Sequence, residues 1–141
     1  MSLSLDRFTK NSYPGVFCAV AILLLTGLPG SLLPKAKPAI GLDKIAHIIM
    51  FLGFSFITLW GYRKPYQENG KNYRIKAIAI TIVISILFGA LTEIMQEAFI
   101  PGRDGNIFDW IADVLGAVFG VCIYYFFQRK RNNLKNAAFR K

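Results

Sequence analysis

Four apolar segments, each close to the length of a membrane-spanning helix, most constrain what this chain can fold into. A helix needs about 20 apolar residues to cross the hydrocarbon core of a bilayer, whereas a barrel strand needs only about 9–11 residues of alternating polarity. The segments therefore predict an all-α integral membrane protein built as a four-helix bundle. They cover roughly Tyr13–Leu33, Lys44–Tyr62, Ile75–Phe99 and Ile107–Phe127.

The organisation around these segments is simple. We predict one membrane domain over residues 13–127, preceded by a tail of residues 1–12 and followed by a basic tail of residues 128–141. Two basic residues before the first segment give it some likeness to a secretory signal, but no clean small-x-small cleavage site follows it, so we expect a retained helix. Cys18 and Cys122 have no CxxC spacing, which favours packing residues over a disulfide or a metal site.

Basic residues are unevenly distributed along this chain of net charge +9. Of the 17 Lys and Arg, 13 lie in the two tails or near the loop after the second segment, which share one side of a four-span topology. The positive-inside rule predicts that this side, with both termini, is cytoplasmic. Because the charge lies between and beyond the apolar segments, it favours contact with membrane lipid, and we expect no nucleic-acid partner.

Three segments carry ionisable residues near the ends that face away from the predicted cytoplasmic side. These residues are the strongest indication of a functional site. A carboxylate in such a position costs about 2.5–3.5 kcal/mol at the centre of a span and is rarely kept without a partner or a function. Glu93 and Asp113 each lie six residues from the end of their segment, and His47 lies six residues after Gly41. At 1.5 Å rise per residue, we expect all three to lie at a depth of roughly 9–10 Å. We expect them to meet in one site, the outer polar site.

The candidate roles follow from the residue types. A buried carboxylate or imidazole can act as general acid or base, and the planar guanidinium of Arg103 suits phosphate or carboxylate. Whether the site only binds a ligand or also modifies it is left open by the sequence. The catalytic candidates are His47, Glu93 and Asp113, and the ligand-binding candidates are Gln96, Arg103 and Asp109; the residues indicate no cofactor.

Structural explanations compete with these roles. Asp43 and Asp109 each lie at the expected start of a helix and would cap its N-terminus. We favour capping for Asp43, whereas for Asp109 capping and a functional role are equally favoured. Arg103 would neutralise the acids in a buried charge network, and Glu97 would be a solvated carboxylate at the interface. In that case the cluster locks helices together in a scaffold or accessory subunit. Gly116 and Gly120, on the face of Asp109, predict close helix packing.

Two further functions are less favoured. A metal site with ligands from His47, Glu93, Asp109 and Asp113 is disfavoured because the chain has one His and no HExxH-like ligand pair. A proton pathway is disfavoured because only Thr81 and Ser85 continue the polar character inward through the third segment.

In these residues the chain resembles the VanZ-like family of small bacterial membrane proteins, over roughly residues 41–120. The family commonly has Asn where this chain has Asp113, which adds a possible negative charge. The matching pieces, in order, are Asp43-Lys44-x-x-His47, Glu93-x-x-Gln96, Pro101-Gly102-Arg103 and Asp109-x-x-x-Asp113-x-x-Gly116-x-x-x-Gly120.

The resemblance implies a setting more than a reaction. The namesake of the family is associated with reduced susceptibility to the glycopeptide antibiotic teicoplanin. The resemblance implies a multi-pass protein of the bacterial plasma (inner) membrane. The distribution of basic residues predicts that its polar site faces outward. The implied partners are membrane lipid and a lipid-linked cell-wall precursor or a glycopeptide; neither the sequence nor the resemblance specifies an oligomeric state.

Overall fold

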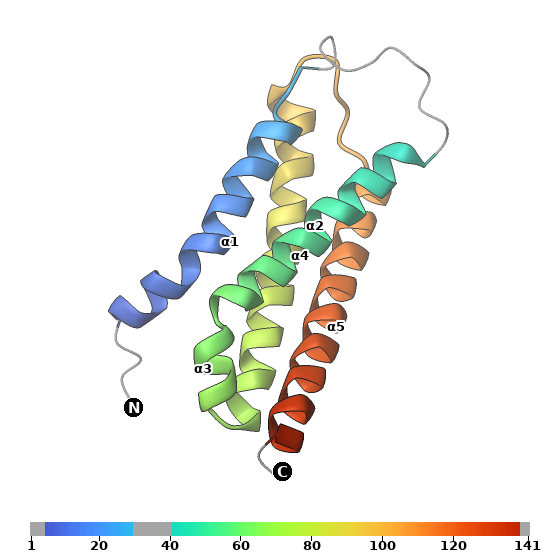
Figure 1. The fold of residues 1–141 in the computed structure, drawn as a ribbon. Helices are drawn as coiled ribbons and strands as arrows, with labels where there is room; N and C mark the ends of the chain where they lie inside the picture. The colour runs from blue at the N-terminus through green and yellow to red at the C-terminus, as the bar shows by residue number, and fades with distance from the viewer. Residues whose placement is uncertain (1–4, 30–40, 139–141) are drawn as a thin grey trace.

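The computed structural model describes residues 5–29 and 41–138, and in this part of the chain it is helical with no strand. Four long helices run lengthwise beside one another, and the short α3 lies at the end where α1 begins and α5 ends (Figure 1). The α4–α5 connection lies at the opposite end. The helices are α1 (Leu5–Thr26), α2 (Leu42–Gly61), α3 (Arg63–Glu68), α4 (Lys71–Phe99) and α5 (Ile107–Ala138).

Helices α2 and α5 form the most extensive packing interface, and glycines allow their close approach. A Cβ on Gly116 would collide with the backbone carbonyl oxygen of Ile48, and one on Gly120 with the carbonyl oxygen of Leu52 and the hydroxyl of Ser55. Backbone atoms cannot swing aside as a flexible side chain can. The predicted role of the two glycines in close helix packing is therefore confirmed.

Helix α1 packs on α2 by a similar device near the α3 end. A Cβ on Gly61 would collide with the backbone carbonyl oxygen of Asn11, and one on Gly15 would lie 2.7 Å from the hydroxyl oxygen of Thr58. Between the helices, aromatic residues fill the core in edge contacts, such as Tyr66 against Tyr124 with ring centroids 5.3 Å apart. The interior is therefore held by close backbone contacts and aromatic packing.

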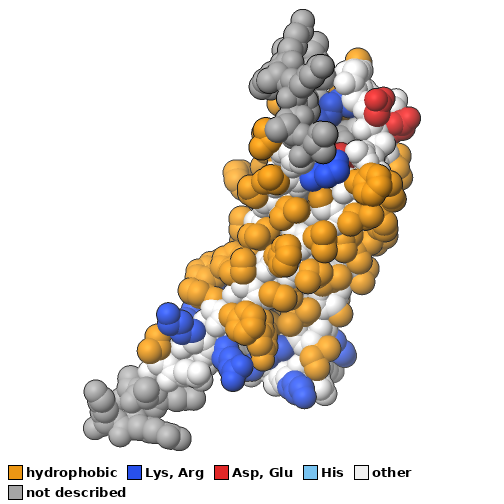
Figure 2. Space-filling view, turned by 90° about the vertical axis from the view of Figure 1, so that its right-hand side faces the viewer, with side chains coloured by type: hydrophobic (Ala, Val, Ile, Leu, Met, Phe, Trp, Pro, Cys, Tyr) orange, Lys and Arg blue, Asp and Glu red, His pale blue; other side chains and the backbone are white. Residues whose placement is uncertain are grey.

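The surface is apolar around the middle and charged at both ends. On the face shown in Figure 2, hydrophobic side chains form a broad band between basic residues at the α3 end and a mixed group with acidic residues at the other. By length and composition, α2, α4 and the part of α5 up to Leu134 can each cross a membrane. The apolar part of α1, Asn11–Thr26, is shorter, so three of the four predicted spans meet this criterion.

The observed ends of the helices agree with the ends of the predicted segments at some boundaries and differ at others. The predicted end at Phe99 and the predicted start at Ile107 are confirmed. Helix α1 begins at Leu5 and ends at Thr26, and residues 27–29 are not helical. The predicted end of the first segment at Leu33 lies outside the described residues. Helices α4 and α5 extend through polar residues because a helix continues beyond the apolar core when nothing in the sequence stops it.

Candidate functional site

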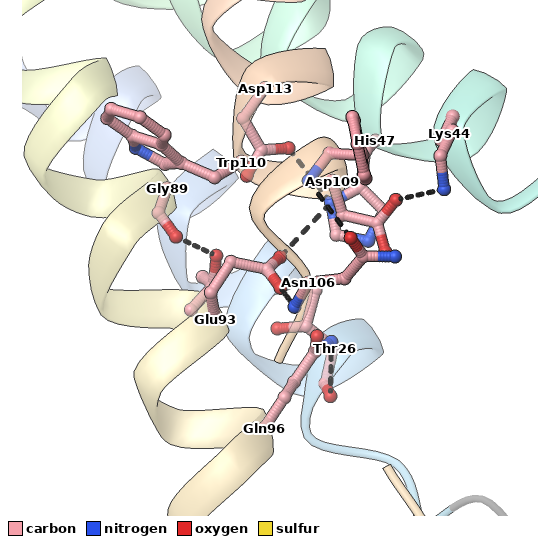
Figure 3. Close-up of polar contacts among 12 residues, drawn as sticks. Thr26, Lys44, His47, Gly89, Glu93, Gln96, Asn106, Asp109, Trp110 and Asp113 are labelled. Carbon is pink, nitrogen blue, oxygen red and sulfur yellow. Dashed lines mark hydrogen bonds and ion pairs between the residues drawn. The ribbon is translucent and has the colours of Figure 1, made fainter. Parts of the chain in front are cut away.

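Side chains from α2, α4 and α5 meet near the end opposite α3, as the sequence predicted. The Nδ1 atom of His47 lies 2.9 Å from Oδ1 of Asp113 and 3.7 Å from Oε1 of Glu93 (Figure 3). All three residues are buried, with 1%, 0% and 8% of their surface exposed, respectively. An imidazole from α2 is thus flanked by a carboxylate from α5 and another from α4.

The connection between α4 and α5 fixes the position of Glu93. Its Oε2 accepts a hydrogen bond of 2.8 Å from the backbone N–H of Asn106, while Oε1 faces His47. The side-chain oxygen of Asn106 accepts a bond from the N–H of Phe108, which caps the start of α5. Glu97 is exposed, as expected, and accepts a 2.7 Å bond from the N–H of Gly105. Two acids of α4 therefore hold the connection in place.

An ion pair lies at the rim of the site. Lys44 Nζ is 2.9 Å from Oδ1 of the buried Asp109, and the Lys44 side chain remains 39% exposed. Asp109 is therefore an ion-pair partner, and Asn106 provides the side-chain cap of α5. The prediction that Asp43 caps α2 is wrong: the N-cap residue is Gly41, and α2 has no side-chain capping hydrogen bond.

The remaining two predicted ligand-binding residues differ in their surroundings. Gln96 is buried, and its side-chain nitrogen donates a 3.3 Å bond to the backbone oxygen of Thr26 at the end of α1. Arg103 is partly buried in the α4–α5 connection and makes no ion pair with any described carboxylate. Lys44, and not Arg103, is thus the cation paired with the acids here.

The buried cluster is incompletely satisfied. Among described side chains, Oε1 of Glu93 and Oδ2 of Asp113 are buried and have no hydrogen-bond partner. The hydrogen bond and ion pairs that His47 makes with the described carboxylates all involve Nδ1. Buried polar atoms are usually paired, so unpaired ones require an explanation. Two buried carboxylate oxygens of the cluster are thus left without a hydrogen-bond donor among the described side chains.

Two sets of three side chains present donor atoms close enough to share a metal ion. One set is His47, Glu93 and Asp113, and the other is Asp43, His47 and Asp109; within each set the donor atoms lie within 4.8 Å of one another. From the sequence, a metal site at His47, Glu93, Asp109 and Asp113 is disfavoured because the chain has one His and no ligand pair such as HExxH. The structure brings that one His together with two carboxylates in each of the two sets.

Sequence reasoning missed several supporting residues. The position of Lys44, directly after Asp43 and one turn before His47, places it near the site. Its partner could not be identified from the sequence, because that depends on how α2 packs on α5. Trp110 donates its indole N–H to the backbone oxygen of Ile86 at 3.1 Å, joining α5 to α4. A Cβ on Gly89 would lie 2.9 Å from Oδ2 of Asp113, so glycine leaves room for that carboxylate.

Comparison with known proteins places this arrangement in a family. The VanZ/LLP1 family model matches residues 6–128, which includes the outer polar site and all the long apolar helices in whole or in large part. No curated protein and no solved structure gives a match. A match to most of the chain, together with three helices apolar enough to span a bilayer, identifies a membrane protein. The chain belongs to the VanZ/LLP1 family.

Proposed function

We propose that this protein crosses the bacterial plasma membrane four times, with both termini in the cytoplasm and the outer polar site near the external surface. Two features support this orientation. The start of α1, the short α3 and the end of α5 lie at one end of the molecule (Figure 1), and basic side chains gather at that end (Figure 2). Positive residues favour the cytoplasmic side.

We further propose that the outer polar site binds an anionic ligand of the cell envelope, such as the headgroup of a lipid-linked cell-wall precursor, and that proton transfer by the site modifies it. The single observation that carries this proposal is the buried cluster of His47, Glu93 and Asp113 with its unpartnered carboxylate oxygens. A cluster that served only to join helices would gain most from pairing every polar atom.

The proposed roles follow from the contacts. Asp113 orients the imidazole through Nδ1, so that Nε2 is available to take or give a proton. Lys44 is partly exposed beside the cluster, and Arg103 is partly buried without an ion-pair partner among described residues; both would attract an anionic group. Protection against glycopeptides of the teicoplanin type is the envelope function that family membership favours.

The test is complementation of a strain that lacks the gene. We expect His47→Ala and Glu93→Gln to lose the teicoplanin protection given by the wild-type protein at equal membrane abundance. Asp104→Asn, an exposed acid in the same connection, is the matched control and should protect fully. If both site variants protect as well as the control, the site has no part in this function.

Orientation is tested separately with reporter fusions. An enzyme that is active only outside the cytoplasm should be active when inserted after Arg103 and inactive when fused after residue 141. The opposite pattern would contradict the proposed orientation and would move the polar site to the cytoplasmic side.

The second candidate function is a scaffold whose polar cluster locks the helices. The observation that favours it is the 2.9 Å contact between His47 and Asp113, which joins α2 to α5. Polar contacts between membrane helices contribute about 0.6 kcal/mol on average. This function predicts that the same two variants reduce the folded yield in detergent, with any loss of protection proportional to the loss of protein.

A further inference from the structure

We infer that His47, Glu93 and Asp113 bind a divalent transition-metal ion of the zinc class, through Nδ1 of the imidazole and one oxygen of each carboxylate. The inference concerns the same side chains as the proposed function. The ion would replace the hydrogen bond between Nδ1 of His47 and Asp113, so that both groups would be oriented by the metal. The inference stands on the geometry of the cluster and holds whatever the envelope ligand is.

The spacing of the donor atoms fits a small ion. Zinc lies about 2.0–2.2 Å from nitrogen and oxygen ligands, so tetrahedral geometry places its ligand atoms roughly 3.3–3.6 Å apart. The observed separations of 2.9 Å, from Nδ1 of His47 to Oδ1 of Asp113, and 3.7 Å, from Nδ1 to Oε1 of Glu93, fall on either side of that range. Shifts of a few tenths of an ångström would bring these two separations into the range, and all donor atoms of the set lie within 4.8 Å of one another.

The unpaired oxygens supply an independent observation. Glu93 is more than nine-tenths buried, and its Oε1 points toward the imidazole without a hydrogen-bond donor among the described residues. Its other oxygen is held by the backbone N–H of Asn106. A ligating carboxylate that is anchored through its second oxygen is the usual outer-shell arrangement of a metal site. Oδ2 of Asp113 is also buried and unpaired.

The balance of charge also favours a cation. The two overlapping sets around His47 contain four carboxylates, of which three are buried, and Lys44 is the only lysine or arginine that forms an ion pair with them in the described part of the chain. Uncompensated charge is costly away from water. A divalent ion would offset most of the excess and would also allow an anionic headgroup to approach.

The alternative set, Asp43, His47 and Asp109, is the weaker candidate. The ammonium group of Lys44 lies 2.9 Å from Oδ1 of Asp109 and would repel a second cation there. Asp43 is exposed, whereas every member of the preferred set is buried. The ion is therefore assigned to the set on α2, α4 and α5. Three protein ligands leave a fourth position for water or a phosphoryl oxygen, which is the pattern of catalytic zinc sites.

The experiment measures metal binding by the full-length protein in detergent. His47 is the only histidine, so the protein is purified with a tag that contains none, stripped of metal with a chelator and titrated calorimetrically with Zn²⁺. We expect one Zn²⁺ per chain and a higher Tm on binding. His47→Gln and Glu93→Gln should weaken binding at least tenfold, while Asp104→Asn should bind as the wild type does.

A spectroscopic measurement on the wild-type protein covers the case in which the variants fail to fold. Cobalt(II) in place of zinc should give the visible absorption of a four-coordinate site. Absence of both this absorption and stoichiometric Zn²⁺ binding would overturn the inference and leave protonation as the means of removing the excess charge. Zn²⁺ binding that survives Glu93→Gln but is lost in Asp43→Asn would overturn the assigned ligands. Neither result depends on teicoplanin protection, so the inference and the proposed function fail separately.

Discussion

Replacing Gly116 with alanine tests how tightly the α2–α5 interface is packed. The new Cβ would collide with the backbone carbonyl oxygen of Ile48 and would lie 2.9 Å from the Cα of that residue. Overpacking of this kind typically costs about 1–3 kcal/mol. Because the obstacle is backbone, relief requires α2 and α5 to separate, and His47 directly precedes the point of contact.

Gly53→Ala is the matched control. Gly53 also lies inside a helix, but a Cβ added there meets no atom within 4 Å. Both substitutions gain the same helix propensity, about 1 kcal/mol for alanine over glycine, so that contribution cancels in the comparison. We expect the free energy of unfolding of Gly116→Ala to be lower than that of Gly53→Ala by about 1–3 kcal/mol.

The assay is reversible unfolding in mixed detergent micelles, followed by tryptophan fluorescence, with helicity checked by circular dichroism. Equal stabilities for the two variants, or a more stable Gly116→Ala, would refute the close approach of α2 and α5. A parallel Zn²⁺ titration would show whether their separation also weakens metal binding at the neighbouring imidazole.

Three further experiments test individual contacts in the same unfolding assay. A double-mutant cycle of His47→Ala and Asp113→Ala should give a coupling of about 0.6 kcal/mol and at most about 1.7 kcal/mol; zero coupling would contradict their contact. Trp110→Phe should lower the unfolding free energy by about 0.5–1.5 kcal/mol, because the bond to Ile86 is lost. Asn106→Ala should cost about 0.5–2 kcal/mol through loss of the cap, and Asn106→Asp should retain most of the stability.

The shared depth of His47, Glu93 and Asp113 could be predicted from the sequence, because depth follows from the rise per residue along an apolar helix. The sequence also identified the glycines at the α2–α5 interface, because small residues four apart favour close packing of membrane helices. Both inferences use regularities within one helix. The catalytic and binding roles of these residues stay predictions.

Pairings between helices could not be derived in the same way. The choice of Lys44 over Arg103 as partner of Asp109 depends on the rotation of α2 about its axis and on the path of the α4–α5 connection. The expected cap by Asp43 failed because the chain enters α2 at Gly41, whose φ of 123° few other residues adopt. Gln96 bonds to a carbonyl of α1, a contact that no local pattern indicates.

The division of the polar cluster among three helices has a consequence for biogenesis. During synthesis, His47 leaves the ribosome more than 40 residues ahead of Glu93 and more than 60 ahead of Asp113. The imidazole is thus synthesised before either acid, and each acid can meet it only after its own helix has been made. Completion of the cluster is therefore a late step of assembly, and a nascent protein stalled before residue 106 would lack both the N–H of Asn106 that holds Glu93 and the carboxylate of Asp113 that holds His47.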